Sequence, residues 1–309
     1  MITSVSLNPC IDKRIEVEAF VRGGLNRVVN TASEPAGKGV NVAITVSALG
    51  EEPCLVGFMS PGESNLFEDL FRAQNIRWEF IQRSGSVRTN IKVMDRTRFE
   101  VTELNESGEP ITNEQLAAMT NLIVRHGRQS DYLVLTGSVP PGCAPEYYGR
   151  ITEILRDSTC RCVLDADGLL LKYGVMAHPF MVKPNLHELE RWFGRRLITR
   201  KDILNAACKM VHSGAERVVV SLGADGAIMT DGRESYYAPG MEINVQSTVG
   251  AGDALLGGMV VGLSQKRPLE EVFAMGMACA ALRCESFRQA DWNQRRFDEW
   301  VNRVKIRKV

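Results

Sequence analysis

The chain has 309 residues, of which 44% are hydrophobic and 24% are charged, as in an ordinary globular protein. Lysine and arginine balance aspartate and glutamate at 37 each, so charge gives no reason to expect nucleic acid or an anionic membrane as a partner. The eight cysteines and four histidines show no metal-ligand spacing. The first residues lack the basic and apolar regions typical of a signal peptide, and no apolar run approaches the ~18 residues of a membrane span. We therefore expect a cytoplasmic protein with reduced thiols.

Short apolar runs alternate with helical patterns along most of the chain. Six runs predict buried strands: Thr3–Leu7, Cys54–Phe58, Tyr132–Leu135, Val163–Asp165, Phe180–Val182 and Val218–Ser221. A capping-box signature at Thr112 and Gln115 begins one predicted helix, and another begins at Thr199. This alternation is typical of an α/β fold with a mostly parallel central sheet flanked by helices on both faces.

Two segments instead alternate charged and apolar residues with a period of two. They are Lys13–Phe20 and Arg88–Leu104. The apolar positions are Ile15, Val17 and Ala19 in the first segment, and Ile91, Val93, Phe99 and Val101 in the second. Such patterning predicts strands with one solvated face. We expect a small separate sheet that forms a lid over a cleft.

The segment Gly250-Ala-Gly-Asp253 leads into an apolar helix rich in small residues. Glycines at a helix start let a ligand approach the free N–H groups, and these groups and the helix dipole form an anion site. Asp253 would then accept a proton from an attacking hydroxyl. The alternative is a tightly packed helix with Asp253 as a cap. The Gly-x4-Gly-Lys-Ser/Thr pattern of a P-loop is absent.

Four further glycine-rich or polar loops lie beside predicted strands: Pro35–Ala43, Thr136–Gly142, Lys183–Glu188 and Ser221–Gly226. Lys38 in the first loop could reach a phosphate, or it could be a surface lysine. Asn185 and Glu188 also form a serviceable helix N-cap pair, and Ser221–Gly226 could be a plain hairpin turn. Together the loops outline a cleft at one end of the sheet, where open α/β sheets bind ligands.

Seven motifs, in order, resemble those of the PfkB (ribokinase-like) carbohydrate kinases, in particular the branch of 1-phosphofructokinases and tagatose-6-phosphate kinases. They are Ser6–Asp12, Ala36–Ala43, Arg88–Lys92, Thr136–Gly142, Lys183–Glu188, Ser221–Gly226 and Ser247–Asp253. The resemblance covers nearly the whole chain. It implies a single ribokinase-like kinase domain over residues 1–309, with lid segments at about 12–30 and 88–106.

The resemblance also implies ATP-dependent phosphorylation of a ketohexose phosphate with Mg²⁺. Asp253 would be the general base, and Gly250, Ala251 and Gly252 the anion hole. Residues expected to hold the sugar or its phosphate are Asp12, Arg27, Gly37, Lys38, Asn41, Arg88 and Ser138. Residues expected to border ATP are Lys183, Asn185, Ser221, Gly223 and Gly226. Asn185 and Glu188 would organise Mg²⁺ through water.

Fructose 1-phosphate is the expected substrate, tagatose 6-phosphate is the alternative, and a non-catalytic sugar-phosphate-binding protein is the alternative of another class. The sequence departs from the family pattern at three places: Pro35–Gly39 lacks a further glycine, Asp167 replaces a small hydroxyl residue, and Glu285–Gln289 replaces a Thr/Gly-rich loop. A carboxylate at Asp167 would disfavour a phosphate if it faced the pocket. A homodimer through the lid is possible for such a chain.

Overall fold

A large, mostly parallel sheet forms the centre of the computed structural model, which describes residues 1–98, 100–286 and 292–309. Its strand order is β14-β13-β12-β11-β10-β9-β8-β1-β4-β5. The strands are β1 (Ile2–Ser6), β4 (Pro53–Met59), β5 (Arg77–Gln82), β8 (Tyr132–Thr136), β9 (Arg161–Asp165), β10 (Met181–Val182), β11 (Val218–Ser221), β12 (Ala227–Thr230), β13 (Ser235–Ala238) and β14 (Arg307–Lys308). All six predicted strands are confirmed, with ends that shift by at most two residues. Strands β12 to β14 pair antiparallel at one edge.

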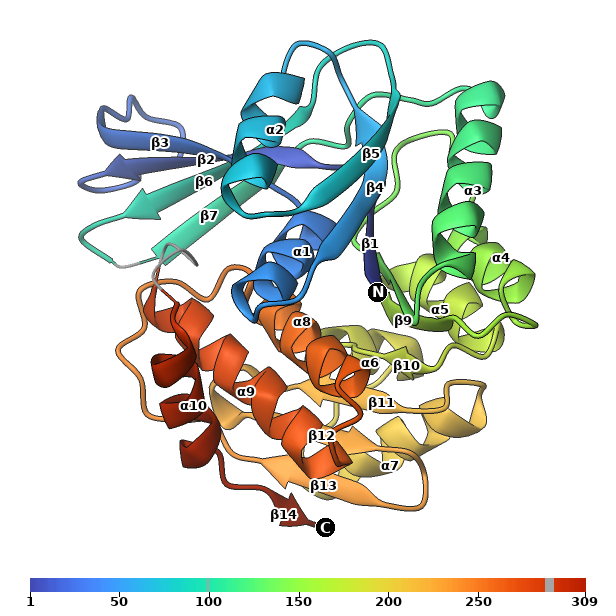
Figure 1. Ribbon diagram of the computed structural model, residues 1–309. Helices are drawn as coiled ribbons and strands as arrows, with labels where there is room; N and C mark the ends of the chain where they lie inside the picture. Colours follow the sequence, from blue (N-terminus) through green and yellow to red (C-terminus); the bar gives the residue numbers. More distant parts are fainter. Residues whose placement is uncertain (99, 287–291) are drawn as a thin grey trace.

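Helices cover both faces of this sheet (Figure 1). They are α1 (Lys38–Ala48), α2 (Ser64–Ala73), α3 (Asn113–Arg128), α4 (Tyr147–Ile154), α5 (Gly168–Met176), α6 (Leu186–Phe193), α7 (Arg200–His212), α8 (Ala251–Ser264), α9 (Leu269–Glu285) and α10 (Gln294–Arg303). Thr112 caps α3 and Thr199 caps α7, each through the two reciprocal hydrogen bonds of a capping box. Both helix starts are therefore confirmed.

The alternation of side chains along the strands explains why the core has two halves. On β8, Leu133 and Leu135 pack with α3 to α7, whereas Tyr132 and Val134 pack with α1, α8, α9 and α10. Strand β8 buries both its faces, so its sequence is continuously apolar rather than alternating. This is the pattern that the sequence predicted for the central strands.

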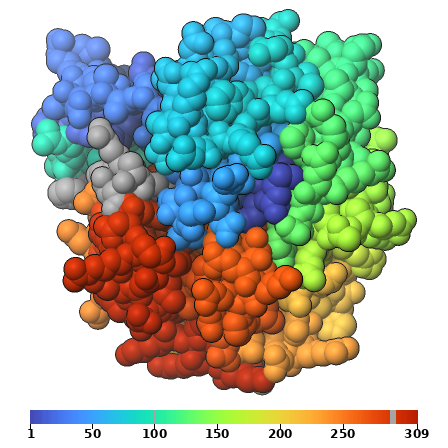
Figure 2. Space-filling model, in the orientation of Figure 1, coloured from blue at the N-terminus to red at the C-terminus, as the bar shows by residue number. Residues whose placement is uncertain are grey.

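A second sheet of four strands, in the order β3-β2-β6-β7, stands off the main body as a lid (Figures 1 and 2). Its strands are β2 (Cys10–Val17), β3 (Val28–Ala36), β6 (Arg88–Asp95) and β7 (Glu100–Asn105). The predicted small sheet is thus confirmed, although β3 continues to Ala36, and Phe99 lies outside the described residues. Strand β2 follows β1 after only three residues, so the lid is attached close to the centre of the main sheet.

No helix in the described ranges combines the length and the apolar character needed to cross a membrane.

Candidate active site

A cleft of about 1050 Å³ lies between the carboxyl ends of the parallel strands and the lid. Both sheets and the loops between them supply its walls. Of the residues predicted from the sequence, the following line it: Asp12, Gly37, Lys38, Asn41, Arg88, Ser138, Lys183, Asn185, Glu188, Ser221, Gly250, Gly252 and Asp253. The expectation that the separate loops converge on one cleft is therefore met by the geometry.

Asp253 lies in the first turn of α8, and only 6% of it is exposed. The Asn41 side chain donates a hydrogen bond of 2.8 Å from Nδ2 to Asp253 Oδ2, which fixes the carboxylate and leaves Oδ1 outside this bond. Gly250 caps the helix with a φ of 79°, a left-handed conformation that favours glycine. The first N–H groups of a helix have no intrahelical partner, so this turn can bind an anion beside Asp253.

Two lysines flank a fully buried carboxylate, Asp165, at the end of β9. Lys38 Nζ and Lys183 Nζ each lie 3.3 Å from an Asp165 oxygen, and Thr136 Oγ1 donates a 3.3 Å hydrogen bond to it. Lys183 is almost buried, whereas 39% of the Lys38 side chain is exposed. Lys183 Nζ also lies 3.2 Å from the position that a Cβ would take at Gly252. The lysines therefore bring positive charge to the anion site of α8.

These charges shift one another's protonation equilibria. Burial would raise the pKa of Asp165, but Lys183 and Lys38 outweigh it and hold that pKa below its usual value. Burial lowers the pKa of Lys38, but Asp165, Asp253 and Glu188 raise it further than burial lowers it. For Asp253 burial dominates, so its pKa is raised despite Lys38 and the Asn41 hydrogen bond. A carboxylate with a raised pKa and a lysine nearby is the type of group that acts as a general base.

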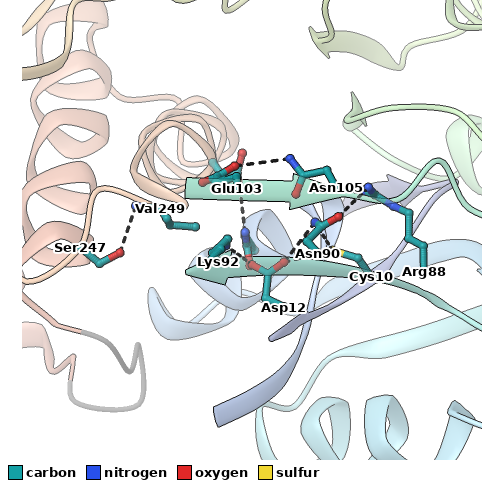
Figure 3. Close-up of polar contacts among 11 residues, drawn as sticks. Cys10, Asp12, Arg88, Asn90, Lys92, Glu103, Asn105, Ser247 and Val249 are labelled. Carbon is teal, nitrogen blue, oxygen red and sulfur yellow. Dashed lines mark hydrogen bonds and ion pairs between the residues drawn. The ribbon is translucent and has the colours of Figure 1, made fainter. Parts of the chain in front are cut away.

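The lid carries a polar row on β2 and β6 that faces the cleft (Figure 3). Asp12 accepts a 3.1 Å hydrogen bond from Asn90 Nδ2 and forms an ion pair with Lys92. Arg88 Nε donates to the Asn8 carbonyl at 3.1 Å, and Nη1 donates to Asn90 Oδ1 at 2.9 Å. Arg88 is therefore held rigidly by hydrogen bonds, which leaves Nη2 as the nitrogen outside them.

Asn185 and Glu188 form the reciprocal capping box of α6, so the helix-cap alternative for this motif is realised. Asn185 N donates to Glu188 Oε2 at 2.8 Å, and Glu188 N donates to Asn185 Oδ1 at 2.9 Å. Burial raises the pKa of Glu188, against the effect of Lys38. Both residues still line the cleft, and Glu188 Oε1 stays outside the cap.

Asn185 and Glu188 suit Mg²⁺ that is bound through water molecules, not by direct coordination to several protein side chains. Within the described parts of the chain, no group of three or more His, Cys, Asp or Glu side chains is placed to hold a metal ion. Mg²⁺ dehydrates reluctantly and usually keeps several waters together with substrate phosphates. The buried Glu188 carboxylate at the cleft wall suits an ion held in that way.

Four predicted residues do not line the cleft: Arg27, Gly223, Gly226 and Ala251. Arg27 is exposed in the loop between β2 and β3. The Ala251 N–H already donates to the Thr248 carbonyl at 3.2 Å. Gly223 and Gly226 belong to a short 3₁₀ turn between β11 and β12, so the hairpin alternative is realised there. A Cβ at Gly226 would lie 2.0 Å from the Ala238 carbonyl oxygen, which gives this glycine a packing role.

The three departures from the family pattern have structural counterparts. Asp167 lines the cleft, but it caps α5 and forms a 2.9 Å ion pair with Arg191, which offsets the negative charge that would repel a phosphate. Pro35 and Ala36 belong to β3 and pair with Ile11 and Cys10, so a strand occupies the place of the missing glycine. In the segment Glu285–Gln289, residues 287–289 lie outside the described residues.

The sequence analysis missed Asp165, Asn90 and Lys92 as site residues. A signal was present for each. Asp165 is a charged residue that directly follows a buried apolar strand segment, at the edge of the sheet where ligands bind. Asn90 and Lys92 follow Arg88 at steps of two along β6, so all three side chains face the same side of the lid.

Comparisons with known proteins agree with this architecture. Residues 5–293 match the family model described as "pfkB family carbohydrate kinase". The 1-phosphofructokinase of Bacillus subtilis is 33% identical over 277 residues, with 90% of each chain covered. That of Escherichia coli K12 is 34% identical over 282 residues, covering 91% of this chain and 90% of the relative. Phosphofructokinase-2 from Escherichia coli, solved with substrates and products, superposes with a TM-score of 0.88 at 25% identity, covering 98% of both chains.

The large covered sheet and the small lid sheet define the ribokinase-like class of sugar kinases. Within that class, the chain belongs to the pfkB family of carbohydrate kinases.

Proposed function

We propose that this protein is a 1-phosphofructokinase, which transfers the γ-phosphoryl group of ATP to fructose 1-phosphate and forms fructose 1,6-bisphosphate. The observation that carries the proposal is the position of Asp253, which lies at the start of α8 inside the cleft, fixed by Asn41 and close to the positive charges of Lys38 and Lys183. The curated relatives named 1-phosphofructokinase, at 29–34% identity over about 90% of the chain, support the choice of sugar.

In the proposed reaction, Asp253 Oδ1 accepts the proton of the free primary hydroxyl of the sugar as that oxygen attacks the γ-phosphorus. The bond from this phosphorus to the β–γ bridging oxygen breaks, and ADP leaves with the electron pair. Developing negative charge would be stabilised by the N–H groups of the first turn of α8 and by Lys183 beside Gly252. Phosphoryl transfer needs little beyond such positioning and neutralisation.

The phosphate that the substrate already carries would lie against Arg88 and Lys38, with Ser138 beside them. Arg88 is held by the carbonyls of Asn8 and Glu106 and by the Asn90 side chain, so it presents Nη2 in a fixed direction as a charged donor to the phosphate. Asp12, Gly37 and Asn41 would contact the sugar. Arg27 lies too far along the lid loop, outside the cleft lining, so we leave it out of this assignment.

ATP would lie along Lys183, Asn185 and Ser221, whose main chain pairs with that of Asn185 as an isolated parallel bridge. Asn185 and Glu188 would hold Mg²⁺ through water, and the ion would neutralise phosphate charge. We also propose that residues 1–309 act as one domain, in which the lid segments near 12–30 and 88–106 close over the sugar and exclude water as a competing acceptor.

The outer strands of the lid suggest a homodimer as the working form. Strands β3 and β7 carry exposed apolar side chains, of which Val28, Val101 and Leu104 are 50–58% exposed. Exposed edge strands with apolar side chains can pair with another chain. Light scattering after gel filtration would test this arrangement, and a monomer at micromolar concentration would contradict it.

The proposed function is tested by coupled ADP release with fructose 1-phosphate, tagatose 6-phosphate and fructose 6-phosphate at equal concentrations. We expect kcat/KM for fructose 1-phosphate to exceed the others by at least an order of magnitude. A preference for tagatose 6-phosphate would replace the substrate assignment. Tight binding of sugar phosphate without turnover of any of them would contradict the kinase assignment itself.

A further inference from the structure

A second hollow, of about 420 Å³, lies at the edge of the main sheet opposite the cleft. We call it the basal groove. Because β8 to β11 are parallel and end at the cleft, their amino ends meet at this other edge. The residues that line the groove are Tyr132, Arg161, Phe180, Glu216, Arg217, Leu263, Lys266, Arg267 and Leu269. Four strand starts and the turn between α8 and α9 therefore supply its walls.

Two guanidinium groups stack on one aromatic ring in the groove. The Cζ atoms of Arg161 and Arg217 lie 4.8 Å and 4.5 Å from the centre of the Phe180 ring. Arg161 also donates a 3.0 Å hydrogen bond to the hydroxyl of Tyr132. Cation–π contact and this bond fix both groups in place. The two positive charges are thereby held close together, and stacking on a neutral ring does not cancel their repulsion.

The residues that line the groove include four cations and one carboxylate. Among the lining residues in the described ranges, Glu216 is the one carboxylate, and its contact with Arg217 Nη1 is 3.6 Å long. Glu271, outside the lining, lies 3.5 Å from Arg267. Arg217 Nε and Nη1 are buried and form no hydrogen bond with any described residue. Asp131 and Asp231 also lie outside the lining, where Lys266 and Arg217 help to lower their respective pKa values. The excess of positive charge is therefore confined to the lining itself, where part of the Arg217 guanidinium is unsatisfied.

We propose that the basal groove binds a small phosphorylated molecule through its phosphate. Guanidinium groups recognise phosphate oxygens with paired N–H groups, and the lysine on the turn adds a point charge. The volume lies within the usual range for small-molecule sites, about 300–1,000 Å³. Another hollow, of about 500 Å³, adjoins the basal groove and shares Arg161, Phe180 and Glu216 with it. The non-phosphate part of the ligand therefore has room to extend along the sheet edge.

The groove and the cleft lie at the two ends of α8. Asp253 is in the first turn, and Leu263, whose carbonyl accepts a 3.3 Å hydrogen bond from Tyr132 Oη, is in the last. A helix of 14 residues is about 21 Å long. A ligand in the groove therefore does not touch the cleft, and the two sites can be measured separately.

The test is calorimetric titration of the full-length protein with pyrophosphate at low salt. The variants are Lys266→Gln/Arg267→Gln, on the exposed turn, and Arg217→Gln, in the wall. Lys201→Gln removes an exposed lysine of α7 that lines neither site and serves as the matched control. Kinase activity, which all variants should retain, verifies folding.

We expect each groove variant to weaken one binding step at least about tenfold, since each removes a charge-assisted contact, while Lys201→Gln changes nothing. Titration with ADP and with fructose 1,6-bisphosphate then shows whether the ligand is a nucleotide or a sugar phosphate. The groove variants should weaken the binding only of the compound that occupies the groove. Unchanged binding of pyrophosphate in both groove variants would overturn the proposal.

Discussion

Asp253→Asn tests the assigned general base with a change of almost constant shape. The amide oxygen of the introduced side chain can still accept the hydrogen bond that Asn41 now donates to Oδ2 at 2.8 Å, so the first turn of α8 should keep its geometry. The amide cannot accept a proton from the attacking hydroxyl. General-base catalysis contributes roughly 10²–10⁴-fold, which is about 3–5 kcal/mol of activation free energy.

We therefore expect kcat to fall by that factor, with KM values for both substrates within about threefold of wild type. The assay is ADP release at saturating fructose 1-phosphate and ATP. In the wild type, the raised pKa of Asp253 should also place the acid limb of the kcat/KM profile above the usual carboxyl range. The variant should lack that limb.

The same substitution should raise stability. In the folded protein the pKa of Asp253 is above its ordinary value of 3.8 because burial disfavours the charged form. The ionised carboxylate therefore destabilises the fold at pH 7, by about 1.4 kcal/mol for each pH unit of that shift, and the amide removes this cost. The gain should disappear when the pH falls below the carboxyl range. A variant that keeps kcat within tenfold, or that unfolds more easily than wild type at pH 7, would refute the reasoning.

Three further predictions follow from contacts around the cleft. Gly39→Ala should lower the urea-unfolding free energy by about 1–3 kcal/mol, since its Cβ would lie 2.5 Å from the Val5 carbonyl oxygen; an unchanged midpoint would contradict this. Arg191→Ala frees the Asp167 carboxylate and should raise KM for the phosphorylated sugar several-fold with KM for ATP unaltered, measured by initial rates. Arg88→Lys removes the hydrogen bonds that fix the guanidinium group and the Nη2 donor that it presents, and should raise the same KM about tenfold; an effect on ATP alone would assign Arg88 to the nucleotide.

The parts of the fold set by local pattern could be predicted from the sequence. The apolar runs indicated the strands of the parallel sheet, and the capping boxes at Thr112 and Thr199 indicated two helix starts. Strand β13 and the edge strand β14 beside it had no such signal. β14 has only two residues, both exposed, and its place depends on pairing with Tyr236 and Tyr237 rather than on its own composition.

The sequence predicted which loops form the site, but it could not predict the contacts between residues of different loops. Glycine spacing indicated an anion site at Gly250–Asp253. Nothing local to Asp165 shows that two lysines, 127 residues before it and 18 after it, meet at its carboxylate. Likewise, Asn185 and Glu188 were expected near ATP and Mg²⁺ with a helix cap as the alternative, and the structure shows the cap within the cleft wall.

The hydrogen bond from Asn41 to Asp253 joins residues 212 positions apart, and the Lys38–Asp165 pair spans 127. A nascent or truncated chain that lacks α8 therefore contains Lys38 and Arg88, which we propose to hold the substrate's phosphate, without the proposed base Asp253. Contacts of such long range form late, because loop closure must come first. Catalysis should accordingly appear in refolding only when the last helices dock. The recovery of activity therefore reports when folding is complete, not when it begins.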